Sequence, residues 1–317
     1  MSVVYFIIQH TMLSMIPLMI VALGGLFSEK SGVVNIALEG KMIMGAFTGI
    51  LFITIFQEAL PGQPVLVLGL IVALITGVLV SFFHAYAAIN LKANQIISGV
   101  AINMFAPAFA VYIARLVTGT QNIHFSNQFR IDSVPFFGDI PVIGTMFFQN
   151  TYITTYLGFV ILAGAAFVLY KTKFGLRLRA CGEHPQAVDS VGVSVTKMRY
   201  FGVLISGALA GIGGLIFIIP TSTVFSGTVS GYGFLALAVL IFGGWRPSRI
   251  LFAAFFFGLM QVIAVSHSNI GFLQNLDIPA HFYRMIPYVA TLIVLAFTSK
   301  NTMAPKAAGQ PYDKGGR

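Results

Sequence analysis

Charged residues are scarce in this chain of 317 residues. Asp, Glu, Lys and Arg make up only 9% of it, whereas hydrophobic residues make up 57%. A water-soluble domain usually carries about 25% charged residues, so a chain with so few is not solvated on all sides. Apolar stretches of about 20 residues, enough to cross a hydrocarbon core of roughly 30 Å, recur along the sequence. The composition therefore predicts a polytopic helical membrane protein.

The chain also lacks the motifs of enzymes and metal proteins. Cys181 is its single cysteine, which excludes an intrachain disulfide. Neither HExxH nor a Ser/His/Asp grouping occurs, and the six histidines are scattered, so we expect no catalysis, no metal and no cofactor. The sequence GxxxxGK followed by Ser or Thr is missing, so no P-loop can hold nucleotide phosphates. Uphill transport would therefore need an ion gradient or a separate ATPase.

Acidic residues are half as frequent as basic ones, 9 against 18, and the net charge is +9. Such a balance can indicate nucleic acid or anionic lipid as a partner. The basic residues lie at loop ends, however, and the preference for positive charge in cytoplasmic loops explains them without nucleic acid. The segments that we expect on the cytoplasmic side are Lys30, Lys92, the loop 171–199, Arg246 with Arg249, and the tail 301–317.

Hydropathy predicts an all-α fold, a membrane bundle of about nine spans in residues 1–300, followed by a cytoplasmic tail at 301–317. With the basic loops inside, the N-terminus lies outside and the C-terminus inside. The expected spans are Tyr5–Phe27, Val34–Phe56, Val65–Asn90, Gln95–Val117, Tyr152–Tyr170, Tyr200–Ile219, Tyr232–Trp245, Ile250–Ser266 and Met285–Thr298. The seventh is short for a bilayer and is expected to be tilted or partly re-entrant.

Two loops stand out between these spans. The extracytoplasmic segment 118–151 is long enough to be a cap or a receptor-docking surface, although a plain solvated loop explains it equally well. The cytoplasmic loop 171–199 is basic and contains a helix signal, because Pro185 suits a first helical position and Gly192 can end the helix. A secondary transporter does not need to offer such a helix to the cytosol, whereas a permease driven by a separate ATPase does.

Polar residues inside the expected spans are mostly uncharged. Gln95, Gly99 and Asn103 are four residues apart and share one helix face. Such a face can line a path for a neutral polar solute or can form hydrogen bonds between helices. Glu39 is costly in a membrane, so we expect it to pair with a cation or a donor in the bundle, in a structural role.

Several stretches resemble the permease subunits of bacterial ABC importers of the branched-chain amino acid, ribose and nucleoside group. The resemblance is closest to nucleoside permeases that work with a lipoprotein of the basic-membrane-protein type. It covers nearly the whole chain, and the combination of motifs is specific. The stretches that carry it are GGLFSEKSGVVNIALEGKMIMGAF (24–47), LKANQIISGVAINMF (91–105), FGLRLRACGEHPQAVDSVGV (174–193), GYGFLALAVLIFGGWRP (231–247), and the tail MIPYVATLIVLAF with APKAAGQPY.

The resemblance implies a non-catalytic multi-pass subunit of the bacterial cell membrane. Its implied partners are a cytoplasmic ABC ATPase, which uses the ATP, a second related permease in a heterodimer, and an extracytoplasmic substrate-binding lipoprotein. The implied substrates are purine and pyrimidine nucleosides. The segment 183–192 would be the helix that couples to the ATPase, although Glu183, Ala187 and Gly192 only approximate the EAA signature of other importers.

The candidate site residues form two groups. The residues expected to contact the ATPase are Glu183, Pro185, Ala187, Val188, Val191 and Gly192. The residues expected to line the substrate path are Asn94, Gln95, Asn103 and Phe234, since amides can bind the edges of a base and an aromatic ring can stack on it. The alternatives are an importer of a sugar such as ribose or of branched-chain amino acids, an ion-coupled secondary transporter, and a structural or receptor-like bundle.

Overall fold

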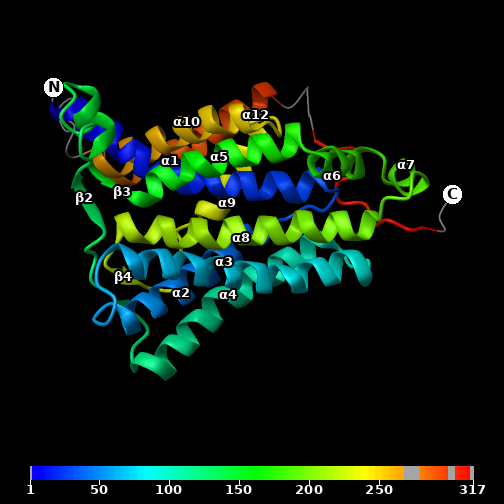
Figure 1. Ribbon diagram of the computed structural model, residues 1–317, viewed down its shortest axis with the longest axis horizontal. Coiled ribbons are helices and arrows are strands. Elements are labelled where there is room, and N and C mark those ends of the chain that lie inside the picture. Colours follow the sequence, from blue (N-terminus) through cyan, green and yellow to red (C-terminus); the bar gives the residue numbers. More distant parts are fainter. Residues whose placement is uncertain (1, 268–278, 299–303, 315–317) are drawn as a thin grey trace.

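The computed structural model describes residues 2–267, 279–298 and 304–314, and within them the chain is a bundle of helices that lie along one long axis (Figure 1). Seven of the described helices are long and apolar enough to cross a membrane, which confirms the polytopic helical bundle. They are α1 (Ser2–Lys30), α2 (Leu38–Phe56), α3 (Gln63–Ala85) with the π-helix η1 (Tyr86–Asn90), α4 (Gln95–Thr118), α5 (Ile153–Lys171), α8 (Val195–Thr221) and α10 (Pro247–Ser266). The count of nine spans and the orientation stay predictions.

Two further helices lie where the seventh and ninth spans were expected. Helix α9 (Tyr232–Phe242) has 11 residues, a length of about 16 Å, or roughly half of the hydrocarbon core. Helix α12 (Ala280–Thr298) packs against α10. The 11 residues of α9 agree with a seventh segment that is short for a bilayer, and its tilted or partly re-entrant course stays a prediction.

The second helix begins later than the sequence indicates. We predicted a span from Val34, but residues 31–37 form a buried, non-helical segment and α2 starts at Leu38. Irregular backbone at membrane depth persists only where protein groups satisfy its hydrogen bonds. Side chains of α1, α3 and α4 do so, among them Ser28, which donates to the carbonyl of Val33 at 2.7 Å, and Gln95, which accepts from the N–H of Val34.

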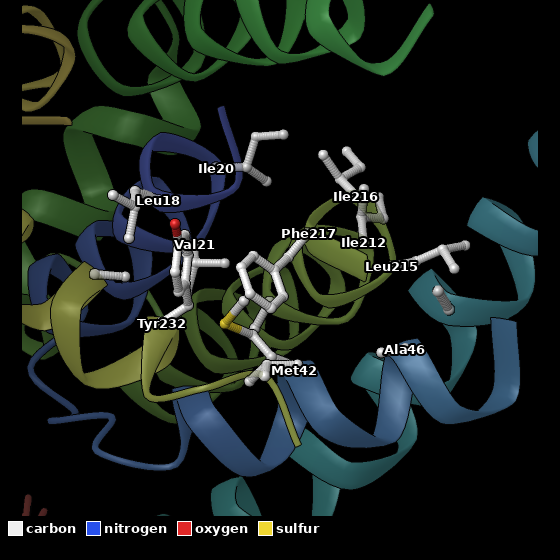
Figure 2. Close-up of a cluster of buried hydrophobic side chains, with 14 of the residues drawn as sticks. Leu18, Ile20, Val21, Met42, Ala46, Ile212, Leu215, Ile216, Phe217 and Tyr232 are labelled. Atoms are coloured by element: carbon white, nitrogen blue, oxygen red, sulfur yellow. The ribbon is translucent and has the colours of Figure 1, made fainter. Parts of the chain in front are cut away.

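Helix α8 is at the centre of the bundle and packs on α1, α2 and α3. Small residues allow this close approach: a Cβ at Gly77 would collide with the backbone of Gly207, and one at Gly45 with the backbone of Gly211. Such spacing packs helices tightly without a hydrophobic driving force between them. Apolar side chains from α1, α2, α8 and α9 fill the space between these backbones (Figure 2).

The two ends of the bundle differ. One end carries four short strands (Figure 1), in which β1 (Ile123–His124) pairs with β4 (Val224–Phe225), and β2 (Arg130–Ser133) pairs with β3 (Gln149–Tyr152). Most of the segment 118–151, which includes the π-helix η2 (Gly144–Phe148), lies at this end. The opposite end carries α6 (Lys173–Glu183) and α7 (Pro185–Ser190).

Candidate functional site

The short helix expected in the basic loop is present as α7, with Pro185 in its first turn. Gly192 has a φ of +80° just beyond its end, a conformation that favours glycine. Local sequence therefore predicted both ends of this helix.

The two valines of this segment have different surroundings. Val188 is 5% exposed and packs in a small cluster with Cys181 and Val195, so it holds α7 onto the bundle. Val191 is 74% exposed and Ala187 is also exposed. Three of the six predicted ATPase-contact residues are exposed and can contact another protein: Ala187, Val191 and Gly192. Pro185 and Val188 are buried, and Glu183 is half-buried. The sequence treated both valines alike, because periodicity in a six-residue helix cannot tell which side is covered.

Helix α6 was not predicted. Thr172 precedes it and accepts a hydrogen bond from the backbone N–H of Gly175 at 3.1 Å, which caps its first turn. Leu178 and Cys181 are buried on one side of it, three residues apart. Burial raises the pKa of the Cys181 thiol to about 11, so the thiol stays protonated at neutral pH. The available signal for this helix was Thr172, a residue type that is common at helix N-caps.

Glu183 ends α6 and lies next to the C-terminal segment 304–314, which folds back over this end of the bundle. The backbone N–H of Lys306 lies 3.5 Å from Glu183 Oε2. The N–H of Ala307 donates to the carbonyl of Gly182 at 2.8 Å, and Gly309 donates to the carbonyl of Gly32 at 3.2 Å. The segment therefore joins the end of α6 to the loop that follows α1, an arrangement that composition alone did not indicate.

Two charged side chains complete this attachment. Arg199 at the start of α8 is 1% exposed, and its Nη1 donates to the carbonyl of Gln310 at 2.9 Å. Asp313 forms an ion pair of 2.8 Å with Lys92, in the turn before α4. We call residues 304–314 the C-terminal strap, because they tie α6, the α3–α4 turn and α8 together.

A cavity of about 350 Å³ lies between α7, the start of α8 and the C-terminal strap. Gly192 and Val193 line one side, and Tyr312 lies on the strap. Burial, together with the nearby carboxylate of Asp189, raises the pKa of the Tyr312 hydroxyl. The cavity and the exposed Val191 together form a surface into which side chains of a partner can fit.

A second cluster of polar contacts lies where α9 begins inside the bundle. Glu39, near the start of α2, accepts a hydrogen bond from the backbone N–H of Gly231 at 2.9 Å and another from Gly233 at 2.6 Å. These donors are N–H groups that a helix N-terminus leaves without an intrahelical partner, and the carboxylate also complements the helix dipole. Glu39 thus caps α9, which agrees with the structural role expected for it.

The amides proposed for the substrate path bind backbone. Asn103 accepts from the N–H of Gly40 at 2.7 Å and donates to the carbonyl of Ile36 at 2.9 Å. Gln95 accepts from the N–H of Val34 at 2.7 Å. These amides supply hydrogen-bond partners to backbone groups of the irregular segment before α2 and of the first turn of α2.

The other two path candidates differ from each other. Asn94 caps α4, and its side chain accepts from the N–H groups of Ile96 and Ile97. Phe234, at the start of α9, is 52% exposed and directly follows the Gly233 that Glu39 binds. Phe234 therefore has a free aromatic face beside the capped helix end. A substrate contact at any of the four residues stays a prediction.

A buried polar cluster beside this segment was not predicted as a site. Lys41 is fully buried, and its Nζ donates to Asn35 Oδ1 at 2.8 Å. Asn35 in turn donates to Ser206 on α8 at 2.7 Å. His84 on α3 contacts Ser98 at 3.0 Å and the carbonyl of Val34 at 3.1 Å. These contacts explain why residues 31–37 can remain irregular inside the bundle.

Among the residues that the structure describes, no three His, Cys, Asp or Glu side chains gather as metal ligands. A comparison with protein families gives a match over residues 7–295 to the family described as the permease component of the branched-chain amino acid transport system. The chain belongs to this permease family. The permease is thus a multi-pass protein of the cell membrane.

Relatives of the permease match over nearly its whole length. The guanosine ABC transporter permease protein NupQ of Bacillus subtilis (strain 168) is 44% identical over 98% of this chain and 97% of its own. The nucleoside ABC transporter permease protein NupC of Lactococcus lactis subsp. cremoris (strain MG1363) is 39% identical over 97% and 96%. NupB of the same strain, also named a nucleoside ABC transporter permease protein, is 24% identical over 95% and 82%. No solved structure matches the chain.

Proposed function

We propose that this permease is one of two membrane subunits of an ATP-driven importer of nucleosides. The observation that carries the proposal is the 44% identity to a guanosine permease over 98% of the chain. The permease performs no catalysis and needs no cofactor, and ATP is hydrolysed by a cytoplasmic ABC ATPase.

The N-termini of α2 and α9 already bind side chains of the protein, which favours a neutral substrate over a zwitterionic amino acid. Transporters often hold a substrate carboxylate at the N-terminus of a broken helix. Here the N–H groups at the start of α9 bind Glu39, and the N–H of Gly40 in α2 binds Asn103. A zwitterion would have to displace these side chains, whereas a nucleoside needs only polar edges and an aromatic surface. We assign stacking of the base to Phe234.

Coupling is assigned to the segment 183–192. We assign the contact with the ATPase to the exposed Ala187 and Val191, and the transmission of force into the bundle to Val188, because it packs against Cys181 and Val195. Closure of the ATPase pair then moves α6 and α7 with the helices to which they are attached. Such a shift between outward-open and inward-open states needs contacts that differ between the two states.

The remaining partners are a second permease and a substrate-binding lipoprotein. The pairing is supported by one Lactococcus strain, which has two relatives of this chain that are both named nucleoside permeases. The lipoprotein is assigned to the segment 118–151, where Phe136 is 89% exposed and Phe137 54% exposed. Exposed aromatic residues of this kind often anchor protein interfaces.

The test is uptake into vesicles that contain the permease, its partner permease, the ATPase and the lipoprotein. We expect ATP-dependent uptake of labelled guanosine, with competition by other nucleosides and none by ribose or leucine. Competition by ribose or leucine alone would overturn the substrate assignment. Uptake driven by an ion gradient without the ATPase would overturn the coupling assignment.

A further inference from the structure

A basic pocket lies apart from the coupling helix and the substrate path, at the end of the bundle that carries α6 and α7. It has a volume of about 360 Å³ and is lined by Lys30, Arg179 and Arg246 together with Tyr170, Trp245 and Ser248. No acidic side chain lines it. Among the described residues these three cations take part in no ion pair, so their charge is available to a ligand.

Two carboxylates lie nearby but are directed elsewhere. Glu29 Oε2 accepts a hydrogen bond of 2.5 Å from the indole N–H of Trp245. Glu183 is next to the backbone N–H of Lys306 in the C-terminal strap. Both charges reach Lys30, as do those of Arg179 and Arg246. They lower the positive potential of the pocket without occupying it.

The start of α10 adds to this potential. Arg246 occupies the cap position and makes no side-chain capping bond, and Pro247 follows it. The free N–H groups and the dipole of a helix N-terminus favour an anion. The pocket therefore combines three cationic side chains with the positive end of a 20-residue helix.

The pocket lies at the level where spanning helices meet the membrane surface. Lys30 is the last residue of the first spanning helix, Tyr170 is next to the end of the fifth, and Ser248 is the second residue of α10. Phospholipid headgroups lie at this level, and basic pockets between helices recognise anionic ones. Tyr and Trp side chains are also typical of this interface.

A second, apolar cavity lies further along α10. Ser248 lines the basic pocket, whereas Leu251, Phe252 and Phe255 line a cavity of about 690 Å³ whose walls also include Phe159 of α5. Positions 248, 251, 252 and 255 are spaced by three, four and seven residues, so they form one stripe on the helix. This stripe changes from polar to apolar from the membrane surface inward, as a phospholipid does.

We propose that Lys30, Arg179 and Arg246 bind the phosphate of an anionic phospholipid whose acyl chain lies along Leu251, Phe252 and Phe255. The lipid would fill the groove between α5 and α10 and would fix the α9–α10 turn next to the membrane. A free phosphate could satisfy the cations, but it would leave the apolar cavity without an occupant.

Trp245 provides the assay, because it is the single tryptophan of the chain and lines the pocket. The full chain is placed in nanodiscs of phosphatidylcholine that contain a small fraction of phosphatidylglycerol with brominated acyl chains, which quench indole fluorescence at short range. We expect brominated phosphatidylglycerol to quench several-fold more strongly than brominated phosphatidylcholine at the same mole fraction. Equal quenching by the two lipids would overturn the proposal, and this comparison requires no substitution.

Substitutions then locate the effect. The triple variant Lys30→Gln, Arg179→Gln, Arg246→Gln should lose the preference for phosphatidylglycerol, since each cation is worth about a five-fold change in affinity. The matched control, Lys171→Gln, Lys173→Gln, Lys197→Gln, removes the same charge from exposed positions and should keep the preference. An equal loss in both variants would mean a diffuse surface potential instead of a site.

Two further measurements separate the other occupants. Inorganic phosphate should not relieve the quenching, and relief at millimolar concentration would show a site for a free anion. Native mass spectrometry of the assembled transporter should retain phosphatidylglycerol in preference to phosphatidylcholine. Loss of this lipid from the assembled complex, but not from the isolated chain, would place the pocket in the ATPase interface and overturn the lipid assignment.

Discussion

Replacement of Glu39 tests whether this carboxylate is a helix cap or a substrate ligand. It is 7% exposed and accepts two backbone hydrogen bonds from the start of α9. A buried N–H that loses its partner costs about 1–3 kcal/mol. Glu39→Ala leaves both N–H groups without an acceptor and should destabilise the fold by about 2–6 kcal/mol. Glu39→Gln keeps one acceptor, so its cost should be about half as large.

The assay compares unfolding of the purified chain with uptake by the assembled importer. We expect the order wild type, Glu39→Gln, Glu39→Ala in decreasing stability, with uptake falling in the same order. Glu58→Ala is the matched control, because Glu58 is exposed in the turn after α2 and should change neither quantity. If Glu39→Ala unfolds like the control but abolishes uptake, Glu39 acts on the substrate and the capping argument is refuted.

Three further predictions concern the end of the bundle with α6 and α7. Val191→Asp should leave the fold intact and abolish ATPase co-purification, whereas Val188→Asp should destabilise the chain by several kcal/mol because it buries a charge; equal unfolding of the two variants would contradict the assignment of faces. Truncation after residue 303, which removes the C-terminal strap, should lower ATPase binding and speed hydrogen exchange in α6, and unchanged exchange would show that the strap does not stabilise α6. The pKa of the Cys181 thiol is raised from 9.0 to about 11, so its contribution to stability is complete below pH 9 and is lost as the pH rises to 11. Cys181→Ala should remove this part of the alkaline destabilisation in paired unfolding curves, and identical pH profiles would argue against the burial of the thiol.

Hydropathy and local helix signals predicted most elements because these depend on short-range sequence. The apolar stretches located the spanning helices to within a few residues, and Pro185 and Gly192 located α7. The short seventh segment was also recognisable from its length. Scarce charge and a missing P-loop indicated a transport subunit whose energy comes from elsewhere. Each of these features depends on residues that are neighbours in the chain, so it can be recognised without knowledge of the tertiary structure.

Tertiary structure decided which groups each polar side chain binds and which helix faces are buried. The partners are far apart in the chain: Val34 and Gln95 are separated by 61 residues, and Glu39 and Gly233 by 194. Gln95 could equally have faced a solute path, and only the position of the irregular segment showed that its amide binds backbone. In a dry interior every N–H must find an acceptor, and packing of α8 against its neighbours determines which acceptor lies within reach. The sequence by itself therefore determined the helices and the kind of protein, while the contacts between helices determined the function of each polar side chain.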